Sequence, residues 1–578
     1  MVLFLAPCMV LSETVGQDQG VQCGLECRGN YNALSFEECL KNMTGSVVVF
    51  EDQTGGYSFA RRQANSRFDI QQPIAIIYAK DVREVKESLG CARTYGFQVS
   101  AAGGRHSYQG TSINNGGLVI DLSNITTFQI DEENGYIRVG AGLQGGAVAA
   151  ALASASPNIQ LPTGMCPFVG VSGFTLGGGI GLLGRYLGLM CDNLVGIEAV
   201  DAMGATIAAN ATHNSDLFWA SCGGGGGNFA IVTEFRFRIN ELPNNGRVTY
   251  IKIEYNPGVE NIVSAFMTFQ EWLPRMPDEF GAYIEWQFQR MFLTSIFIGN
   301  QSEATRILNE NGILNNTASV NITEIGGYFG YVKDAMTNLW LDGLIPNDLN
   351  VAEYVMNTLQ MKRGYYRAPG MPGNYQWLMS SSRMPKILPL EEVRELSQYT
   401  YDMGKTTLEL NGSINETKAL FTTWFWVLGG QIRSKRPTQT AFPFRDADYV
   451  MEGSIFFPGK ATRAEFEQKY SDIIDGWTAI ASKYLPREQP AYVNYLNTPS
   501  ELYQISYYGQ NYDRLSKIKQ AYDPANLFWN PYGVEGNPEI SNDTTTRVDI
   551  EDAMASSGAR FELSRIFRYC MILVVAFF

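Results

Sequence analysis

Apolar positions in the first third of the chain alternate between two spacings, which predict alternating strands and helices. Residues 74–79 (IAIIYA) are a short continuous apolar run, whereas residues 81–96 (DVREVKESLGCARTYG) repeat apolar positions every three or four residues. The first pattern is typical of a buried strand and the second of an amphipathic helix. Three further strands and one further helix are predicted over residues 97–104, 116–122, 136–142 and 143–155. The pattern predicts an α+β unit.

The middle of the chain changes character after residues 241–246 (ELPNNG), a Pro/Asn/Gly break that predicts a domain boundary. Residues 247–486 are richer in aromatics and contain segments that predict a sheet, at 282–299 and 419–432. The chain after residue 536 is polar and acidic, which is typical of a tail or stalk.

Composition and charge narrow the function classes. The 578 residues are 45% hydrophobic and 18% charged, ordinary values for a globular protein of more than one domain. A net charge of −14 without a basic run argues against nucleic-acid binding. The two histidines, His106 and His213, and the absence of metal-ligand cysteine spacing argue against a zinc or iron site, so we expect no metal. A GxSxG elbow is also missing, which disfavours a serine hydrolase.

Both ends of the chain carry apolar segments that bear on localisation. Residues 2–12 (VLFLAPCMVLS) are typical of the apolar core of a signal peptide, which we place at residues 1–20. Ser556, Ser557 and Gly558, a polar stretch and a ten-residue apolar end have the layout of a GPI-attachment signal, although a disordered tail is the alternative. We expect a secreted protein. The sequence leaves open whether it is attached to the cell surface. Nine N-glycosylation sequons agree with secretion, at Asn42, Asn124, Asn210, Asn300, Asn315, Asn321, Asn411, Asn415 and Asn542.

Two glycine-rich loops carry the residues with distinctive chemistry. Residues 100–112 (SAAGGRHSYQGTS) contain His106, and residues 162–181 (PTGMCPFVGVSGFTLGGGIG) contain Cys166. Because glycine has no Cβ, such loops let backbone N–H groups approach a phosphate or a flat ring closely. An imidazole and a thiol in the walls of such a cradle suggest a cofactor held by covalent bonds. The chain is therefore a candidate flavoenzyme.

This pair of loops resembles the berberine-bridge-enzyme-like FAD oxidases of the vanillyl-alcohol-oxidase superfamily. In members with two covalent flavin bonds, a His in a GGxHS-like loop binds the 8α carbon, and a Cys in a GxCxxVGxxGxxxGGG loop binds carbon 6. Three further segments match the family in order, at residues 216–237, 491–497 and 507–531. The resemblance covers about residues 67–531.

The resemblance implies an α+β fold with a two-part PCMH-type FAD-binding domain and a substrate domain whose antiparallel sheet is covered by helices. We expect the FAD-binding domain at residues 21–245 and the substrate domain at 246–486. A C-terminal segment at 487–536 would return to the FAD-binding domain, and 537–578 would be the tail. We expect a monomer.

The implied cofactor is FAD, bound covalently through His106 and Cys166. Further cofactor-binding residues are expected in both loops and in the three matching segments: Gly103, Gly104, Arg105, Ser107, Gly164, Val169, Gly170, Gly173, Gly177, Gly178, Gly227, Asn228, Ile231, Val232, Trp529 and Asn530. Val169 occupies the place of a small gatekeeper that admits dioxygen in family oxidases, so we favour an oxidase over a dehydrogenase.

The family resemblance also suggests a catalytic base. Its members use a tyrosinate in the Y-x-N-Y segment, which implies Tyr495 as the base and Tyr492 as the alternative. A phenol has an ordinary pKa near 10, so a base at neutral pH needs cationic neighbours or a charged flavin. Lys362 and Arg363 are candidate cations.

Some positions depart from the family and one pair agrees with it. Phe174 stands where many relatives have His, Leu187 interrupts the RxYGLxxDN pattern, and Phe444 replaces the His of FPH. These departures place the substrate and the rate in doubt. The spacing of Cys39 and Cys91 matches a disulfide of plant relatives, which implies the same bond here.

Three functions remain open from the sequence. The first is a secreted FAD oxidase that takes a hydride from a C–OH group, with a carbohydrate as donor, dioxygen as acceptor and hydrogen peroxide as product. The second is oxidation or dehydrogenation of an alcohol or an alkaloid-like natural product. The third is a flavin-binding surface protein without turnover.

Overall fold

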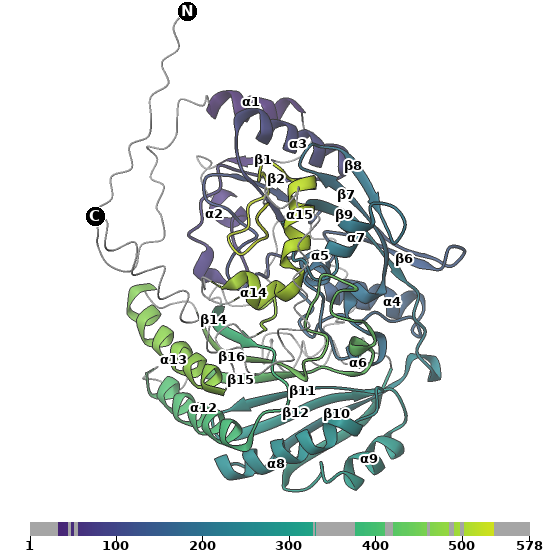
Figure 1. Ribbon diagram of the computed structural model, residues 1–578, viewed down its shortest axis with the longest axis vertical. Coiled ribbons are helices and arrows are strands. Elements are labelled where there is room, and N and C mark those ends of the chain that lie inside the picture. Colours follow the sequence, from purple (N-terminus) through teal and green to yellow (C-terminus); the bar gives the residue numbers. More distant parts are fainter. Residues whose placement is uncertain are drawn as a thin grey trace, which may run out of the picture.

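The computed structural model describes residues 33–43, 48–50, 56–326, 330, 376–410, 420–458, 463–484, 490–496 and 502–536. Two layered parts make up this chain, as Figure 1 shows: an upper part with two sheets and a lower part with one large sheet. This arrangement and the large antiparallel sheet confirm the predicted α+β class. Among the helices of the described residues, none has the length and apolar character that crossing a bilayer requires.

Within the described residues, the strands form three sheets. The first has the order β1 (Val48–Phe50), β2 (Ala75–Tyr78), β4 (Leu118–Asp121), β3 (Val99–Ala102). The second has the order β5 (Phe128–Asp131), β6 (Tyr136–Gly140), β9 (Ala230–Arg238), β7 (Leu194–Asp201), β8 (Thr206–Ala209). The third has the order β13 (Thr317–Ile325), β10 (Val248–Tyr255), β12 (Arg290–Phe297), β11 (Phe280–Gln287), β15 (Leu420–Val427), β16 (Tyr449–Pro458), β14 (Gln376–Arg383).

Helices connect and cover these sheets. In the upper part they are α1 (Ala33–Met43), α2 (Gly56–Ala60), α3 (Val82–Tyr95), α4 (Gly145–Ala155), α5 (Val171–Leu176), α6 (Gly184–Leu187), α7 (Ser215–Ala220), α14 (Tyr503–Tyr508) and α15 (Tyr512–Tyr522). In the lower part they are α8 (Val259–Trp272), α9 (Gln301–Glu310), α12 (Leu390–Leu410) and α13 (Arg463–Tyr484).

Local sequence signals explain where the early elements begin and end. The predicted strand at 74–79 is β2, and the predicted helix at 81–96 is α3. The Asp81 side chain caps α3 by accepting a hydrogen bond from the Glu84 N–H, and Gly96 ends it with a φ of 75°. The remaining strands and the second helix predicted in this region are also confirmed, as β3, β4, β6 and α4.

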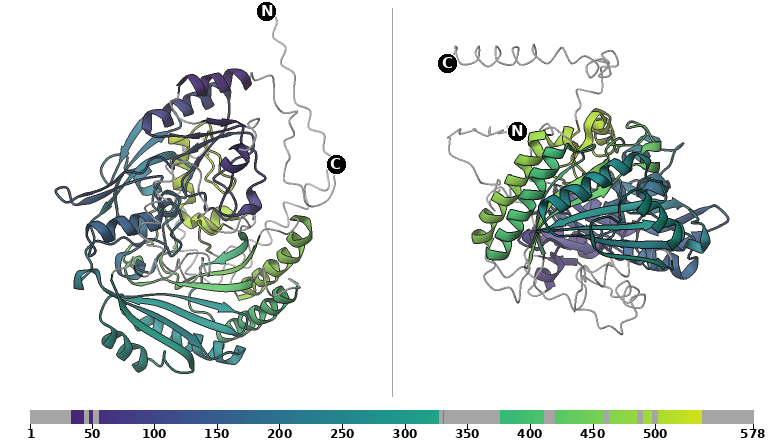
Figure 2. Two further views of the ribbon diagram at one scale, coloured as in Figure 1. Left: turned by 180° about the vertical axis from the view of Figure 1, so that it is seen from behind. Right: turned by 90° about the horizontal axis from the view of Figure 1, so that it is seen from below.

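The seven-stranded sheet has two different faces. One face packs against α8, α12 and α13, which cover it in Figure 1 and in the view from below in Figure 2. Phe421 and Phe425 of β15 point into this core together with Phe266 of α8. Because side chains alternate along a strand, Trp424 and Trp426 point the other way, toward the upper part of the molecule.

The C-terminal segment returns to the upper part, as Figure 1 shows for α14 and α15. Residues 527–529 bind β3: the Val99 N–H donates to the Leu527 carbonyl, and the Trp529 N–H donates to the Val99 carbonyl, each at 2.8 Å. Segments more than 400 residues apart in the sequence therefore share one sheet edge.

The Cys39–Cys91 disulfide implied by the family resemblance is present. It joins α1 to α3 across a Cα–Cα distance of 5.9 Å and encloses a sequence separation of 52 residues. The structure also pairs Cys191 with Cys222, a bond that the sequence analysis did not identify.

Removal of the Cys39–Cys91 bond should destabilise the upper part. A disulfide restricts the unfolded chain, so Cys39→Ser should lower the free energy of unfolding by about 2–5 kcal/mol. Chemical denaturation followed by tryptophan fluorescence measures this change. Cys91→Ser should cause the same loss of stability, and the double variant should lose no more, because either substitution already removes the bond. Wild-type stability in both single variants would contradict the role of the bond.

Candidate active site

The two predicted glycine-rich loops meet at Gly104 and Gly170. A Cβ placed on Gly104 would lie 2.1 Å from the Gly170 nitrogen, and a Cβ on Gly170 would lie 2.2 Å from the Gly104 nitrogen. Any other residue at either position would therefore push the loops apart. Their close approach brings His106 Nε2 to 3.6 Å from Cys166 Sγ. The fold thus brings together the two reactive side chains that the sequence analysis selected.

Arg105 supports this arrangement from inside the protein. Its backbone has a φ of 50°, in the left-handed region that disfavours residues with a Cβ. The buried guanidinium donates to Asp121 of β4 and to the Ala60 carbonyl, and the Nε–Oδ2 distance to Asp121 is 2.9 Å. Arg105 therefore holds the loop through these contacts.

The environment keeps His106 and Cys166 uncharged at neutral pH. Burial lowers the pKa of His106 to about 4 and raises the pKa of the Cys166 thiol to about 11. A neutral imidazole has a free lone pair and is the nucleophilic form. The thiol must lose its proton before it can act as a nucleophile.

One cavity is lined by residues of both loops. Most of the predicted site residues line it: Tyr492, Tyr495, His106, Cys166, Gly103, Gly104, Arg105, Ser107, Gly164, Val169, Gly170, Gly173, Gly227, Ile231, Val232, Trp529 and Asn530. The tertiary structure therefore gathers residues of the two loops, of the β9 region and of the C-terminal segment around one space.

Three predicted cofactor-binding residues lie outside the cavity lining. Asn228 donates to the Gly224 carbonyl at 2.7 Å and accepts from the Val534 N–H at 3.2 Å, so it connects the loop before β9 to the C-terminal segment. Gly177 packs under the Asn494 side chain, and Gly178 packs under the ring of Phe442. These residues shape the wall of the cavity from behind.

The seven-stranded sheet closes the cavity with residues that the sequence analysis missed. Trp424, Trp426 and Glu452 line it, and Trp424 of β15 pairs directly with Glu452 of β16. The signal for Glu452 was present in the sequence, because a single acid interrupts the apolar run of YVMEGSIFFP. A buried acid within such a strand is costly unless it has a function or a partner.

Tyr495 stacks on another missed residue, Tyr108, which follows His106 by two positions. The two rings are parallel within 1°, and their centroids are 5.0 Å apart. Burial raises the pKa of Tyr495 well above 10, and the negative charge of Glu452 raises it further. A hydrogen bond from the Trp426 side chain acts in the opposite direction. The same burial and the same Glu452 charge raise the pKa of Tyr108.

The charged side chain that affects Tyr495 within the described residues is therefore an acid, whereas the sequence analysis named a cation or a charged flavin as the group that would lower its pKa. Among the described residues of the cavity lining, Arg105 is the permanent cation, and Asp121 neutralises it. The candidate cations Lys362 and Arg363 lie outside the described residues.

Tyr492 has a different environment from Tyr495. Its hydroxyl oxygen accepts hydrogen bonds from the Gly179 N–H at 3.0 Å, from the Ile180 N–H at 3.3 Å and from the Asn494 side chain at 2.9 Å. Burial outweighs these donors and raises the pKa of Tyr492 to about 12. These contacts bind the C-terminal segment to the second glycine-rich loop, which favours Tyr495 over Tyr492 as the group that contacts substrate.

The three departures from the family pattern have different surroundings. Phe174 lines it, and its ring packs against Gly164 and Gly179. Leu187 ends α6 and is partly buried. Phe444 lies beside Gly509.

Comparisons with known proteins show what kind of protein this chain is similar to. The chain matches the family descriptions "FAD binding domain" over residues 73–210 and "Berberine and berberine like" over residues 491–535. It is 28% identical over 498 residues to the FAD-linked oxidoreductase YvdP of Bacillus subtilis, covering 85% of this chain and 98% of that protein. It is 26% identical to the glucooligosaccharide oxidase of Sarocladium strictum, covering 87% of this chain and 94% of the oxidase.

A solved structure has the same fold. The glucooligosaccharide oxidase from Acremonium strictum, described as carrying 6-S-cysteinyl, 8α-N1-histidyl FAD, superposes with a TM-score of 0.73 at 24% sequence identity. The match covers 87% of this chain and 99% of that one. The two domain matches and these relatives make the chain an FAD-linked oxidoreductase that is similar to the berberine-bridge-enzyme-like proteins.

Proposed function

We propose that this protein is a secreted oxidase that removes a hydride from a C–OH group of a carbohydrate, with dioxygen as the electron acceptor and hydrogen peroxide as the product. Support comes from one juxtaposition: Tyr495, Tyr108 and Glu452 gather beside His106 and Cys166 in a single cavity. We also propose that residues 21–245 and 487–536 hold the cofactor and that residues 246–486 hold the substrate.

The residues present fit FAD. The cradle at Gly103, Gly104 and Gly170 has no room for a Cβ and so presents backbone groups to the cavity. His106 and Cys166 are the pair expected to attach at two ring positions. The separation of 3.6 Å between His106 Nε2 and Cys166 Sγ supports two covalent bonds to one ring system. When bound, FAD supplies the hydride acceptor and transfers the electrons to the final oxidant.

Tyr495 and Glu452 are proposed to move the substrate proton together. A phenol with a pKa well above 10 is already protonated at neutral pH, so it can accept a proton only while it gives up its own. Glu452 lines the same cavity, and its charge raises the pKa of Tyr495, so we assign this carboxylate as the acceptor for that second proton. The substrate hydroxyl proton then ends on the Tyr495 oxygen, and the original phenol proton ends on Glu452.

The cavity wall supports a carbohydrate as the substrate. Trp424 and Trp426 present large rings to the cavity, and the aliphatic faces of sugar rings pack well on such surfaces. A relative with 26% identity carries the name glucooligosaccharide oxidase. Val169 lines the cavity next to the cradle, in the position expected to admit dioxygen.

A screen for peroxide release tests the function directly. Purified protein incubated with mono- and oligosaccharides and with a panel of alcohols should release hydrogen peroxide with an oligosaccharide, and the same sugar should bleach the flavin absorbance without oxygen. Bleaching by a sugar without peroxide release would indicate a dehydrogenase. Bleaching by an alcohol or amine-containing natural product alone would overturn the carbohydrate, and no bleaching by any compound would favour a binding protein.

Secretion predicts glycans at particular sequons. Asn42, Asn300, Asn315 and Asn321 are exposed, so glycans there meet no packed surface. Asn124 is partly buried, and its side-chain nitrogen donates to the Tyr78 carbonyl at 3.2 Å. Mass spectrometry of protein from a eukaryotic secretory host should find glycans at the exposed sites and an unmodified Asn124. Retention of the protein in the cytosol with every sequon unmodified would contradict secretion.

A further inference from the structure

The segment between β15 and β16, residues 428–448, crosses from the sheet to the cofactor cradle. Its first carbonyl, that of Leu428, accepts a hydrogen bond from buried Arg185 of α6 at 2.6 Å. Further along, the Thr438 carbonyl accepts from the Trp219 ring nitrogen at 2.9 Å. The strands on either side of this crossing segment carry Trp426 and Glu452 of the cavity wall. Its position therefore determines where the substrate-facing wall lies.

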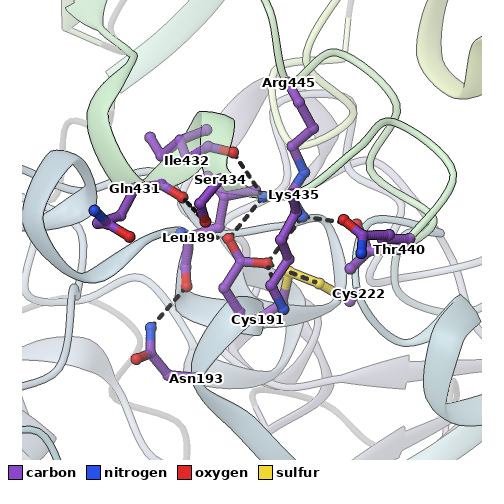
Figure 3. A network of polar contacts seen from close by, with 12 residues as sticks. Leu189, Cys191, Asn193, Cys222, Gln431, Ile432, Ser434, Lys435, Thr440 and Arg445 are labelled. Carbon is purple, nitrogen blue, oxygen red and sulfur yellow. Dashed lines mark hydrogen bonds and ion pairs between the residues drawn. A yellow bond between two sulfur atoms is a disulfide. The ribbon is translucent and has the colours of Figure 1, made fainter.

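An ion pair lies at the end of the crossing segment. Arg445 makes a two-point contact with Asp192, at 2.6 Å from Nη1 and 2.9 Å from Nη2, and both side chains are almost fully buried. Asp192 also accepts from the Leu189 N–H at 2.9 Å and lies 3.4 Å from the Lys435 ammonium. Figure 3 shows Arg445 and Lys435 converging beside the disulfide in this network. Each charge of this buried pair therefore has a hydrogen-bonded partner of opposite charge, which offsets the cost of removing it from water.

The Cys191–Cys222 disulfide connects this ion pair to two glycine-rich stretches, the loop at residues 162–181 and the run at residues 223–227. Cys191, next to Asp192, donates its N–H to the Gly178 carbonyl at 2.9 Å. Cys222 precedes the run at 223–227, whose Gly223 N–H donates to the Leu176 carbonyl at 3.0 Å. The disulfide therefore holds together the two backbone turns that form one wall of the cradle.

Phe442 of the crossing segment lies between these turns and the tyrosines. Its N–H donates to the Cys222 carbonyl at 2.9 Å. A Cβ at Gly178 would lie 2.8 Å from its ring, and a Cβ at Gly223 would lie 2.2 Å from its nitrogen. On the other side the ring meets Tyr492 edge-on, with centroids 6.3 Å apart. Residues 490–496, which carry Tyr492 and Tyr495, are called the tyrosine segment. Any shift of Phe442 therefore moves the surface on which this segment packs.

We infer that the Asp192–Arg445 ion pair, held by the Cys191–Cys222 disulfide, is a positioning joint that sets the distance between the cofactor cradle and the substrate-facing wall. Neither residue lines the cavity. They act through Phe442 on the tyrosine segment, and through the crossing segment on Trp426 and Glu452. Hydride transfer depends steeply on distance, so a displacement of about 1 Å can slow it about 10²-fold.

Asp192→Asn and Arg445→Met test the joint in the FAD-loaded full-length protein. We expect covalent flavin content to remain at the wild-type level while flavin reduction slows by about 10²-fold. The visible circular dichroism of the flavin should change, since it reports the asymmetric surroundings of the ring. Hydrogen exchange should accelerate in peptides covering 177–191 and 429–445 and stay unchanged in α8. In the double variant the two effects should not add, because both residues form one contact.

Matched controls separate positioning from general destabilisation. Phe269→Leu lowers stability in the helix-covered core, away from the cavity, and should leave flavin reduction and dichroism unchanged at an equal loss of thermal stability. Equal effects of Phe269→Leu and Asp192→Asn on all three readouts would overturn the inference, as would unchanged dichroism and exchange in both joint variants. The turnover measurement rests on the proposed function, whereas dichroism and exchange need no substrate. If no substrate of the wild-type protein is found, the proposed function is refuted, whereas dichroism and hydrogen exchange still test the positioning joint.

Discussion

Tyr495→Phe should slow flavin reduction about 10²–10⁴-fold, because a positioned proton acceptor contributes that order to the rate. The substitution keeps the ring that stacks on Tyr108 at 5.0 Å and removes only the hydroxyl. Bound-flavin absorbance should therefore stay normal. Anaerobic stopped-flow reduction by the substrate found in the peroxide screen measures the effect. A reduction rate within a few-fold of wild type would show that the ring only packs, and Tyr492→Phe would then be the next variant.

Glu452→Gln is the companion variant for the proton relay. Gln keeps the shape of the side chain and cannot take the phenol proton, so the loss should be of the same order as for Tyr495→Phe. The double variant should lose little more than either single one, since groups that act as a unit are not additive. Full activity of Glu452→Gln would exclude the relay.

The covalent flavin bonds should respond to variants of His106 and Cys166 in a defined pattern. His106→Ala should keep flavin through the sulfur, and Cys166→Ala should keep it through the imidazole, because the two side chains 3.6 Å apart are proposed to bind different ring positions. His106→Ala/Cys166→Ala should release all of it. Acid precipitation followed by absorbance of pellet and supernatant measures the partition. Loss of the 8α bond should also lower the redox potential and slow turnover.

Wild-type protein provides the reference for this pattern. Its acid pellet should stay yellow, and the mass of the flavin peptide should include segments of both loops. His213→Ala is a suitable control, since His213 is exposed and does not line the cavity. Free FAD in the wild-type supernatant would refute covalent attachment. Full release of the flavin from either single variant would refute attachment through two separate covalent bonds.

The family resemblance carried most of the site, for a reason visible in the loops. Gly104 and Gly170 must lack a Cβ for the loops to touch, so this requirement leaves a readable trace in the sequence. Likewise, the cap at Asp81 and the turn at Gly96 define α3 through contacts within a few residues. The Cys39–Cys91 bond followed from the resemblance, whereas residue spacing alone could not have paired the nine cysteines.

The local elements, the two glycine-rich loops and the pairing of His106 with Cys166 could be predicted from the residues, because each depends on local backbone requirements or on a family pattern that encodes them. The folded arrangement was needed to show that Glu452 lines the cavity beside Trp424 and that Asp192 meets Arg445, 253 residues further along the chain. Such contacts depend on strand register and on which face of a sheet points inward. A shift of one residue in the register of β16 would place Glu452 on the helix-covered face, and no local signal records that choice.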